Sequence, residues 1–249
     1  MSQNEKYILV TGGTRGIGKA IALSQAAKGT TLFLNYLRDD ASALKVKSAA
    51  EKKGSKVILL PANVGDPEGV SSLFESIKKT ASHLDAVIHS AALGVFKPVH
   101  QLRVKDWDIS LDVNAKAFLL LSQAALLLMK KNGGNLLAIS SLGSRRFTPE
   151  YGAIGISKAA LENLVRYLAV ELAPHKIRVN AVSGGLVDTD SLRMFPHFET
   201  LKKEYLSRTP GGRLGKAEDI ADIVTFLLSP QSGWIYGQTL IADGGYSLL

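Results

Sequence analysis

The amino-acid sequence predicts an α/β fold in which a doubly wound parallel sheet forms one domain over residues 1–249. Short β-branched or apolar runs alternate with longer helical segments along the whole chain, as in sheets whose parallel strands are joined by helices. The first run leads directly into a glycine-rich turn, where such sheets bind phosphates. A length of 249 residues suits one large domain, and no repeat, linker or low-complexity tract divides the sequence.

The predicted strands and helices alternate regularly. We expect strands at Tyr7–Thr11, Thr31–Tyr36, Lys56–Leu60, Asp85–Ser90, Asn135–Ser140, Arg178–Val182 and Thr239–Ala242. We expect helices at Gly16–Lys28, Ala41–Lys53, Pro67–Ala81, Trp107–Lys131, Tyr151–Ala173 and Ala217–Leu228. Ligands of such sheets bind beyond the carboxyl ends of the strands, near the point where the strand order reverses. A functional site is therefore expected in the loops that follow the strands.

Composition excludes several classes of protein. A hydrophobic fraction of 46% is too high for a mainly disordered chain. The most apolar segment, Phe118–Met129, is interrupted by Ser122 and Gln123, so it predicts a buried helix and no membrane span. The chain has no cysteine, which excludes disulfides and thiolate chemistry, and no metal site is expected. A strand that begins by Tyr7 leaves no room for a signal peptide, so we expect a cytoplasmic protein.

The net charge of +8 favours anionic partners. Phosphorylated cofactors, acidic carrier proteins and nucleic acid all qualify, and a solvated basic surface explains the charge equally well. Because no helix-turn-helix or aromatic-basic motif is evident, nucleic-acid binding is not expected.

The first predicted strand is followed by a glycine-rich turn and then at once by a helix. The glycines let the backbone turn tightly and approach a pyrophosphate, and the helix N-terminus offers free N–H groups. The spacing is G-x-x-x-G-x-G rather than G-x-G-x-x-G, and an ordinary tight turn is the alternative interpretation. Its place in the first turn of a Rossmann-like sheet favours dinucleotide binding. The residues expected to bind the cofactor here are Gly12, Thr14, Arg15, Gly16, Ile17 and Gly18.

The end of the second predicted strand indicates which dinucleotide is bound. NAD sites usually place an acid there for the ribose 2′-hydroxyl, but this strand ends in Asn35 and Tyr36. Arg38 follows, and Arg15 lies in the glycine-rich turn. Two guanidinium groups suit a 2′-phosphate, which arginine can bind in bidentate fashion. We therefore expect NADPH, although the two aspartates directly after Arg38 and the possibility that both arginines are merely solvated leave NADH open.

A second set of polar residues follows the fifth predicted strand. Ser141 comes directly after that strand, Tyr151 and Lys158 fall in the first turns of a long predicted helix, and Asn114 lies in the earlier long helix. Together with the glycine-rich turn, these residues make the chain resemble the short-chain dehydrogenase/reductase family. The resemblance covers essentially the whole chain. It includes Asn180–Thr189, which matches the segment beside the nicotinamide, and Gly237–Gly245, which matches the last strand.

The spacing before Lys158 departs from the usual pattern of this family. Ordinary members have a tyrosine four residues before the lysine, where this chain has Ile154, which cannot donate a proton. Tyr151 stands seven residues before Lys158, and seven helical steps come within about 20° of a full repeat, so the two share a helix face. Tyr-x(6)-Lys resembles the enoyl-acyl-carrier-protein reductase branch of the family.

The second half of the chain resembles the type III NADPH enzymes of Gram-positive bacteria within that branch. The segments that carry this resemblance are Ile139–Ser144, Tyr151–Lys158, Ala169–Leu172, Val179–Gly185 and Asp188–Asp190. A Gly-Gly pair, Gly184 and Gly185, replaces the usual Pro-Gly of the family.

The chemistry of enoyl reduction explains a displaced tyrosine. Hydride goes to C3 of the enoyl thioester while charge develops on the C1 oxygen, about two bonds further away, so the donor that stabilises this oxygen should also shift. One alternative is a 3-oxoacyl or other carbonyl reductase, which Ile154 argues against. The others are a non-enzymatic NADPH-binding regulator or an inactive relative, against which the intact Tyr151, Lys158 and Asn114 argue.

The resemblance implies roles for the catalytic residues in reduction of a trans-2-enoyl thioester by NADPH. Tyr151 would bond the developing enolate oxygen and relay a proton, and Lys158 would bind the nicotinamide ribose. Asn114 would kink its helix and relay water. Ser141 occupies the position of the ordinary family serine, and its role in the enoyl branch stays open.

The resemblance also implies further cofactor contacts. His89 stands where the family has asparagine, and we expect it to pack behind the cofactor rather than to act as an acid or base. Asn63 replaces a family acid near the adenine and can still bond the adenine through its side-chain oxygen. The remaining contacts, several of them through the backbone, are expected from Val64, Ala91, Gly185, Val187 and Thr189.

The segment at about 190–210 is expected to form a mobile helical lid over the substrate. Its apolar residues Leu192, Met194, Phe195 and Phe198 would line an acyl tunnel. Residues 191–216 contain six cations and two acids, an excess of 6 − 2 = +4. This excess predicts a basic face that docks an acidic acyl-carrier protein, extended by Arg145 and Arg146, unless it is simply a solvated helix face. The resemblance also implies a homotetramer in contact through Trp107–Lys131 and Tyr151–Ala173.

Overall fold

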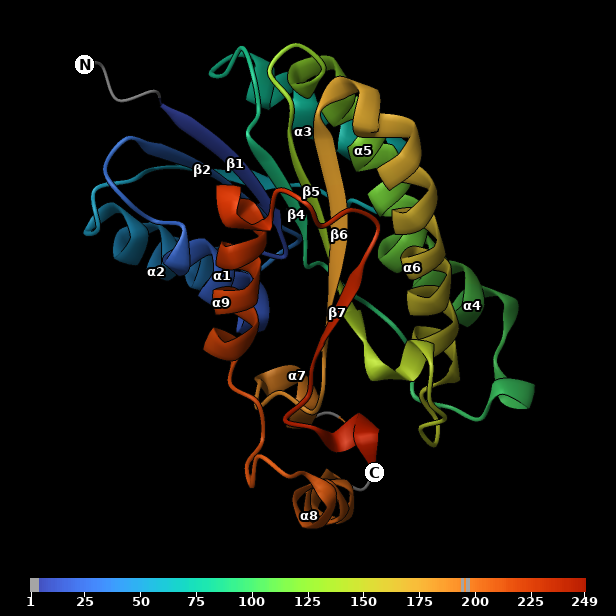
Figure 1. The fold of residues 1–249 in the computed structure, drawn as a ribbon. Helices are drawn as coiled ribbons and strands as arrows, with labels where there is room; N and C mark the ends of the chain where they lie inside the picture. Colours follow the sequence, from blue (N-terminus) through green and yellow to red (C-terminus); the bar gives the residue numbers. More distant parts are fainter. Residues whose placement is uncertain (1–4, 194, 196–197) are drawn as a thin grey trace.

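The computed structural model describes residues 5–193, 195 and 198–249. Seven strands form one parallel sheet in the order β3-β2-β1-β4-β5-β6-β7, with helices on both faces (Figure 1). The strand order reverses between β1 and β4, so the crevice where ligands of such sheets bind lies beyond the carboxyl ends of these two strands. The predicted fold class, a doubly wound parallel sheet in a single domain, is confirmed.

The elements follow the predicted order. The strands are β1 (Lys6–Thr11), β2 (Thr30–Tyr36), β3 (Lys56–Pro61), β4 (Ala86–His89), β5 (Gly134–Ser141), β6 (Ile177–Gly184) and β7 (Thr239–Ala242). The α-helices are α1 (Gly16–Ser24), α2 (Asp40–Glu51), α3 (Pro67–Lys78), α4 (Val104–Leu111), α5 (Ala117–Met129), α6 (Gly152–Leu172), α7 (Asp190–Arg193), α8 (Phe198–Arg208) and α9 (Ala217–Leu228). Helix α1 ends four residues earlier than predicted, because the backbone N–H and C=O of Ala27 both bond the hydroxyl of Ser55.

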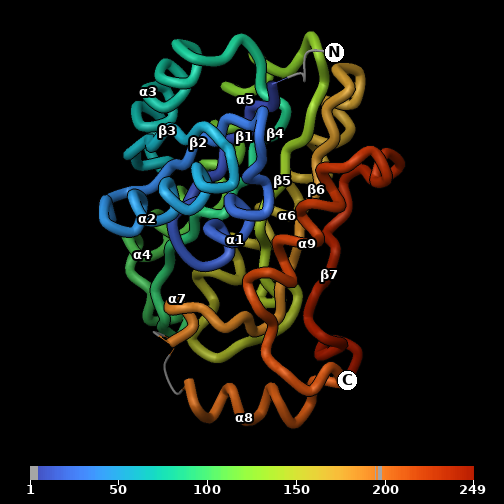
Figure 2. The backbone as a smooth tube through the Cα atoms, turned by 90° about the vertical axis from the view of Figure 1, so that its left-hand side faces the viewer, coloured from blue at the N-terminus to red at the C-terminus, as the bar shows by residue number. Residues whose placement is uncertain are grey.

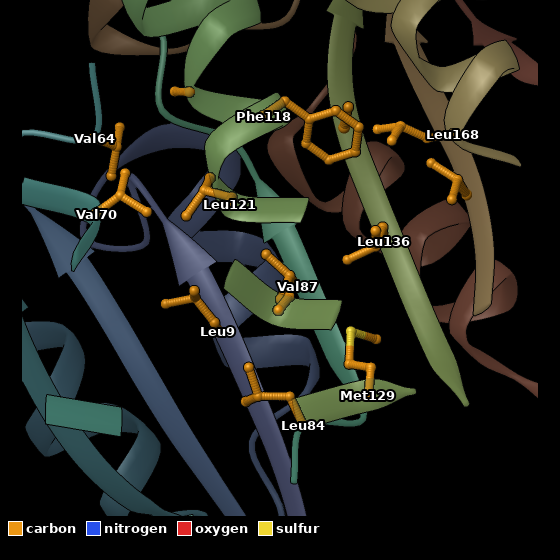
Figure 3. Packing of buried hydrophobic residues seen from close by; sticks show 14 of the residues in the cluster. Leu9, Val64, Val70, Leu84, Val87, Phe118, Leu121, Met129, Leu136 and Leu168 are labelled. Carbon is orange, nitrogen blue, oxygen red and sulfur yellow. The ribbon is translucent and has the colours of Figure 1, made fainter. Parts of the chain in front are cut away.

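Side chains that alternate along the buried strands belong to two separate hydrophobic cores, one on each face of the sheet. On one face, Leu9 of β1 and Leu136 of β5 pack with residues of α3, α5 and α6, among them Phe118 and Leu121 (Figure 3). On the other face, Ile8 and its neighbours pack against α1, α2 and α9. Because both faces are covered, the strands are almost continuously apolar, as parallel strands usually are.

The long helix predicted at Trp107–Lys131 is present but is not regular. Helices α4 and α5 are joined by a π-helical turn, η2 (Asp112–Lys116), which contains Asn114. By length and composition the run Val104–Met129 would be able to cross a membrane. Its residues Phe118, Leu121 and Met129 are fully buried in the core, so in this structure it is a partly buried core helix.

The segment predicted as a lid contains the two helices α7 and α8. Both lie beyond the carboxyl ends of the strands, and α8 runs across that end of the molecule (Figures 1 and 2). Two helices therefore occupy the segment predicted as a lid, whereas its role as a lid and its mobility stay predictions. Met194, expected to line the acyl tunnel, lies outside the described residues.

Candidate active site

The glycine-rich turn has the geometry of an anion cradle. Gly12 and Gly16 have φ of +63° and +50°, a region that other residues seldom adopt. A Cβ on Gly18 would lie 2.1 Å from the carbonyl oxygen of Gly12, so the helix is packed directly onto the turn. Helix α1 starts at Gly16 with no acid in its first turn and no side-chain cap from Arg15. Its N-terminal N–H groups are therefore directed at the space where a pyrophosphate fits.

Predicted cofactor residues from three loops meet at this turn. A Cβ on Gly12 would approach the backbone of Ala91, after β4, to 2.9 Å, and Ala91 N–H donates to the Thr11 hydroxyl over 3.3 Å. The methyl group of Thr189, after β6, lies 3.5 Å from where a Cβ on Gly16 would be. The structure thus brings Ala91 and Thr189 together with the glycine turn at the predicted crevice.

Other predicted cofactor residues are placed mainly for packing. Thr14 is buried, and Ile17 packs against the core between α1 and α9. Val187 is buried beside Ile220 of α9 and forms an isolated bridge with Gly215. These side chains shape the cradle, so any contact of Val187 with a cofactor would come from its backbone.

Gly185 is required by a close approach of the lid. A Cβ there would lie 1.9 Å from the hydroxyl of Tyr205 in α8 and 2.9 Å from Asp243 after β7. Tyr205 in turn donates to the carbonyl of Asp243 over 3.0 Å. Gly185 therefore admits the tyrosine that anchors α8, a reason for this glycine that the sequence did not reveal.

The two aspartates that follow β2 and left NADH open as the cofactor, Asp39 and Asp40, are hydrogen-bonded within the protein. Asp39 caps α2 by accepting from Ser42 N–H over 2.9 Å, and Asp40 accepts from the Tyr36 hydroxyl over 2.6 Å. The bonds from Ser42, aided by the nearby charge of Arg15, lower the pKa of Asp39. Arg15 and Arg38 are both exposed. This end of the site therefore presents two exposed guanidinium groups, while both acids are hydrogen-bonded to neighbouring residues of the chain.

The predicted adenine contacts are only partly available. Asn63 is exposed, and its side-chain oxygen accepts from Gly65 N–H over 3.1 Å, which uses one of its two lone pairs. The side chain of Val64 is buried in the core, so only its backbone can face a ligand.

The catalytic tyrosine predicted from the Tyr-x(6)-Lys spacing does face another predicted residue. Tyr151 is the residue that caps the N-terminus of α6 rather than its first helical residue. Its hydroxyl donates to Ser141 Oγ over 3.2 Å, and Ser141 Oγ also accepts from Gly143 N–H. A Cβ on Gly143 would lie 2.4 Å from the Tyr151 ring, so this glycine lets the ring lie against the turn after β5. Burial raises the pKa of Tyr151, and the bond to Ser141 opposes this only in part.

Lys158 is buried two turns along the same helix. Its Nζ donates to the carbonyl oxygen of Ile139 over 2.8 Å. Burial lowers its pKa to about 8, although the charge of Glu162 opposes this shift. Ile154, at the ordinary tyrosine position, packs so closely on Gly94 that a Cβ there would be 2.1 Å from its side chain. This position of the site is therefore apolar.

Asn114 holds the loop after β4 against α6. Its side-chain oxygen accepts from Leu93 N–H, and its amide donates to Leu93 C=O and to Ser157 Oγ, all within 2.8–2.9 Å. The side chain is fully buried in the π-helical turn, so the predicted helix irregularity is present. The water-relay role stays a prediction.

His89 connects the end of β1, before the glycine-rich turn, to the π-helical turn that contains Asn114. Its Nε2 lies 3.0 Å from the carbonyl oxygen of Val113 in the π-helical turn, and its Nδ1 lies 2.9 Å from the Thr11 hydroxyl. Burial, with a contribution from the charge of Lys158, lowers its pKa to about 3, so the ring is neutral. It therefore donates to Val113 and accepts from Thr11, as suits a residue that packs behind the cofactor.

An aromatic cluster covers Tyr151. Phe195 of the lid lies 5.6 Å from the Tyr151 ring and 4.5 Å from Phe96, which lies 6.2 Å from Tyr151, all between ring centroids. Phe195 was predicted to line the substrate path, whereas Phe96 was missed, because a lone aromatic in a loop carries no sequence signal. Leu192 of the lid is buried and Phe198 is half-buried.

Half of the cations expected to form a basic face are paired with acids. Arg193 lies near Asp188 and Asp190, Arg208 near Glu204, and Arg213 bonds Asp219 through two nitrogens. Arg145 is bound to Glu162, and Arg146 to backbone carbonyls of Ser247 and Leu249. Lys203 is exposed on α8, and Lys202 lies over the Phe198 ring. Among the described residues, no group of three or more acidic, histidine or cysteine side chains is placed to hold a metal ion.

The comparisons with known proteins agree with this geometry. Residues 12–247 match the family model described as enoyl-(acyl carrier protein) reductase. The chain is 41% identical to a 1-cyclohexenylcarbonyl-CoA reductase of Streptomyces collinus, over 97% of this chain and 86% of that protein. It is 34% identical to an NADPH-dependent aldehyde reductase-like protein of Arabidopsis thaliana, over 97% of this chain and 94% of the other.

Solved structures share the fold over nearly the full chain. A 7α-hydroxysteroid dehydrogenase in complex with NADH superimposes with a TM-score of 0.92 at 30% identity, covering 97% of this chain and 94% of the other. An angucycline C-6 ketoreductase with bound NADP superimposes with a TM-score of 0.90 at 30% identity, covering 99% and 97%. The chain belongs to the short-chain dehydrogenase/reductase family and is an oxidoreductase of the nicotinamide-dependent type found in that family.

Proposed function

We propose that the protein reduces the conjugated double bond of 2-enoyl thioesters with NADPH, and that its physiological substrates are carried on acyl-carrier protein in fatty-acid elongation. The observation that carries this proposal is the position of the Tyr151 phenol. Tyr151 reaches Ser141 from the helix cap, seven residues before Lys158, while the position four residues before Lys158 is filled by Ile154. The similarity to a 1-cyclohexenylcarbonyl-CoA reductase supports reduction of a conjugated thioester.

The residues present fit NADPH as the cofactor. The positive φ of Gly12 and Gly16 and the uncapped start of α1 suit the pyrophosphate. The exposed Arg15 and Arg38 suit a 2′-phosphate, because Asp39 and Asp40 are already hydrogen-bonded within α2 and to Tyr36. When bound, NADPH supplies the hydride of the reduction.

The chain's own groups would stabilise the charge that develops on the thioester oxygen. The raised pKa of Tyr151 keeps its hydroxyl protonated at neutral pH, so it can donate to this oxygen. On substrate binding the oxygen would replace Ser141 as the acceptor, and Ser141, whose Oγ now accepts from Tyr151 and Gly143, would donate to the phenol in return. The Ile139 carbonyl orients Lys158 through one N–H, which leaves two for the ribose hydroxyls.

A carbonyl reductase of the same family is the second candidate. The 3.2 Å bond between Tyr151 and Ser141 creates a pair of hydroxyls that would also polarise a ketone. Initial rates of NADPH oxidation with crotonyl and acetoacetyl thioesters, with the products identified by mass spectrometry, distinguish the two functions. Butanoyl product supports the proposal, whereas 3-hydroxybutanoyl product alone supports the carbonyl reductase.

The assembly and the carrier are further parts of this proposal. Exposed apolar side chains on α5 and α6, namely Leu127, Tyr167 and Val170, are suited to contacts between copies of the chain in a homotetramer. Light scattering of the purified protein tests this directly. Lys202 and Lys203 remain as the cations of α8 that are bound to no acid among the described residues, so the carrier-docking face is smaller than the charge count suggests.

A further inference from the structure

A buried carboxylate lies one helical turn beyond Lys158. Glu162 of α6 is only 4% exposed. Its Oε1 accepts from the hydroxyls of Ser140 and Ser144, both over 2.6 Å, and its Oε2 accepts from Arg145 Nε over 3.0 Å. Hydroxyl bonds this short are typical of an ionised acceptor. All three donors come from one segment, which comprises the end of β5, the 3₁₀ turn η3 (Leu142–Ser144) and the residue that follows this turn, Arg145.

This segment carries the residues that contact Tyr151. Ser141 and Gly143 lie between the two serines that bind Glu162, and they bond the hydroxyl and touch the ring of Tyr151. The turn is also pressed against α6, since a Cβ on Gly155 would lie 2.5 Å from the carbonyl oxygen of Gly143. The carboxylate thus fastens both ends of the turn on which Tyr151 rests.

The same carboxylate lies four residues after Lys158 on α6, and both side chains are buried. Glu162 raises the pKa of Lys158, and the charge of Lys158 in turn helps to keep His89 of β4 neutral. Of the other ionisable groups around the site, Arg145 is bound to Glu162 and Tyr151 stays protonated. Burial alone would push the pKa of Lys158 below about 8, because a buried ammonium loses its hydration. The negative charge of Glu162 therefore favours the protonated form of Lys158.

We propose that Glu162 is a positioning residue with two functions, fastening the Ser140–Arg145 turn beneath Tyr151 and holding Lys158 in its protonated, cofactor-binding form. The inference rests on the proposed function only in taking Tyr151 and Lys158 as the working pair of the site. It holds for enoyl and for carbonyl reduction alike, and its main readout needs no acyl substrate.

The test is the pH dependence of NADPH affinity, measured by cofactor fluorescence between about pH 6.5 and 9.5, a range that brackets a lysine pKa lowered by burial. In the wild type, affinity should fall as pH rises through the pKa of Lys158, because the protonated amine binds the ribose. In Glu162→Gln this falling limb should move to lower pH by roughly one to two units, as expected for removing one charge a helical turn away. Glu171→Gln, an exposed acid on the same helix, is the matched control and should leave the limb in place.

Two further variants separate the effect of charge on Lys158 from the effect of the hydrogen bonds that hold the Ser140–Arg145 turn. Arg145→Ala removes the cation that shares the carboxylate, so the limb should move to higher pH, opposite to Glu162→Gln. Ser144→Ala removes one bond to the carboxylate and no charge, so turnover with any accepted thioester should fall several-fold while the limb stays in place. Arg145→Ala and Ser144→Ala still test the idea if Glu162→Gln does not fold.

The proposal would be overturned if folded Glu162→Gln showed the same pH dependence of NADPH affinity as the wild type. It would also be overturned if Glu162→Gln and Arg145→Ala moved the falling limb in the same direction. If instead the shifts appear but no enoyl thioester is reduced, the proposed function fails and the role of Glu162 stands.

Discussion

The two halves of the site are built in different ways. The nucleotide half, at β1 and α1, is made of backbone: positive φ at Gly12 and Gly16, close packing at Gly18 and the free N–H groups of a helix start. The half that contains Tyr151 is made of side chains from four separate segments, joined by contacts such as Tyr151 to Ser141 and Phe195 to Phe96. The first half is therefore built from one local stretch of sequence, whereas the second depends on contacts between segments that are distant in sequence.

Removing the Tyr151 hydroxyl should have the largest effect. Tyr151→Phe keeps the ring against Gly143 and removes the donor for the developing oxyanion, which typically costs about 10²–10³ in rate. NADPH affinity should stay nearly unchanged, since the cradle is backbone on the other half. Single-turnover and steady-state rates with crotonyl thioester, alongside cofactor titration, measure both. Near-normal turnover would shift the role to Ser141.

A smaller effect is expected from the two arginine side chains that the nucleotide half offers to a 2′-phosphate. Arg38→Ala, or Arg15→Ala, should raise the KM for NADPH by about 10-fold or more, because a charge-assisted bond contributes roughly 1.5–3 kcal/mol. The KM for NADH should change little. Lys52→Ala, an exposed cation at the far end of α2, serves as the control. A wild-type preference for NADH would contradict this part of the account.

His89 tests whether the two halves depend on each other. His89→Leu leaves the Val113 carbonyl and the Thr11 hydroxyl without their partner, which should lower the free energy of unfolding by about 1–3 kcal/mol. Because the ring is neutral, the pH profile of turnover should keep its shape. Chemical denaturation measures the first effect, and loss of an acidic limb in the variant's profile would instead assign His89 a role in proton transfer.

The smallest effect is expected at the lid. Reversing the charge of Lys202 and Lys203 to glutamate should weaken turnover of carrier-protein substrates several-fold, more at low salt, while sparing coenzyme A thioesters, since docking charges act mainly on association rate. Equal loss on both substrate types would mean that α8 acts through the lid itself, and the docking surface should then be abandoned.

The contrast between the halves also explains what the sequence was able to predict. The strand elements and the glycine turn follow from local patterns, and the structure has them as expected. The Tyr151–Lys158 spacing is likewise a local pattern, and its catalytic meaning stays a prediction. The bonds of Glu162 to Ser140 and Ser144, 22 and 18 residues away, depend on tertiary contact and leave no periodic signal. The same is true of the tilted contact between Phe195 and Phe96. The charge count over residues 191–216 could not include ion pairs such as Arg213 with Asp219 for the same reason, because these pairs appear only after folding.

The central claim is that Tyr151, at the N-cap of α6, serves enoyl rather than carbonyl reduction. Ile154, at the ordinary position of the family tyrosine, cannot donate a proton. The most direct test is the ratio of kcat/KM for crotonyl to that for acetoacetyl thioester, measured on the same carrier in the wild type and in Ile154→Tyr. The account predicts a large ratio in the wild type and a lower ratio once a phenol occupies the position four residues before Lys158. A wild-type enzyme that reduces acetoacetyl thioester as well as or better than crotonyl thioester would contradict it.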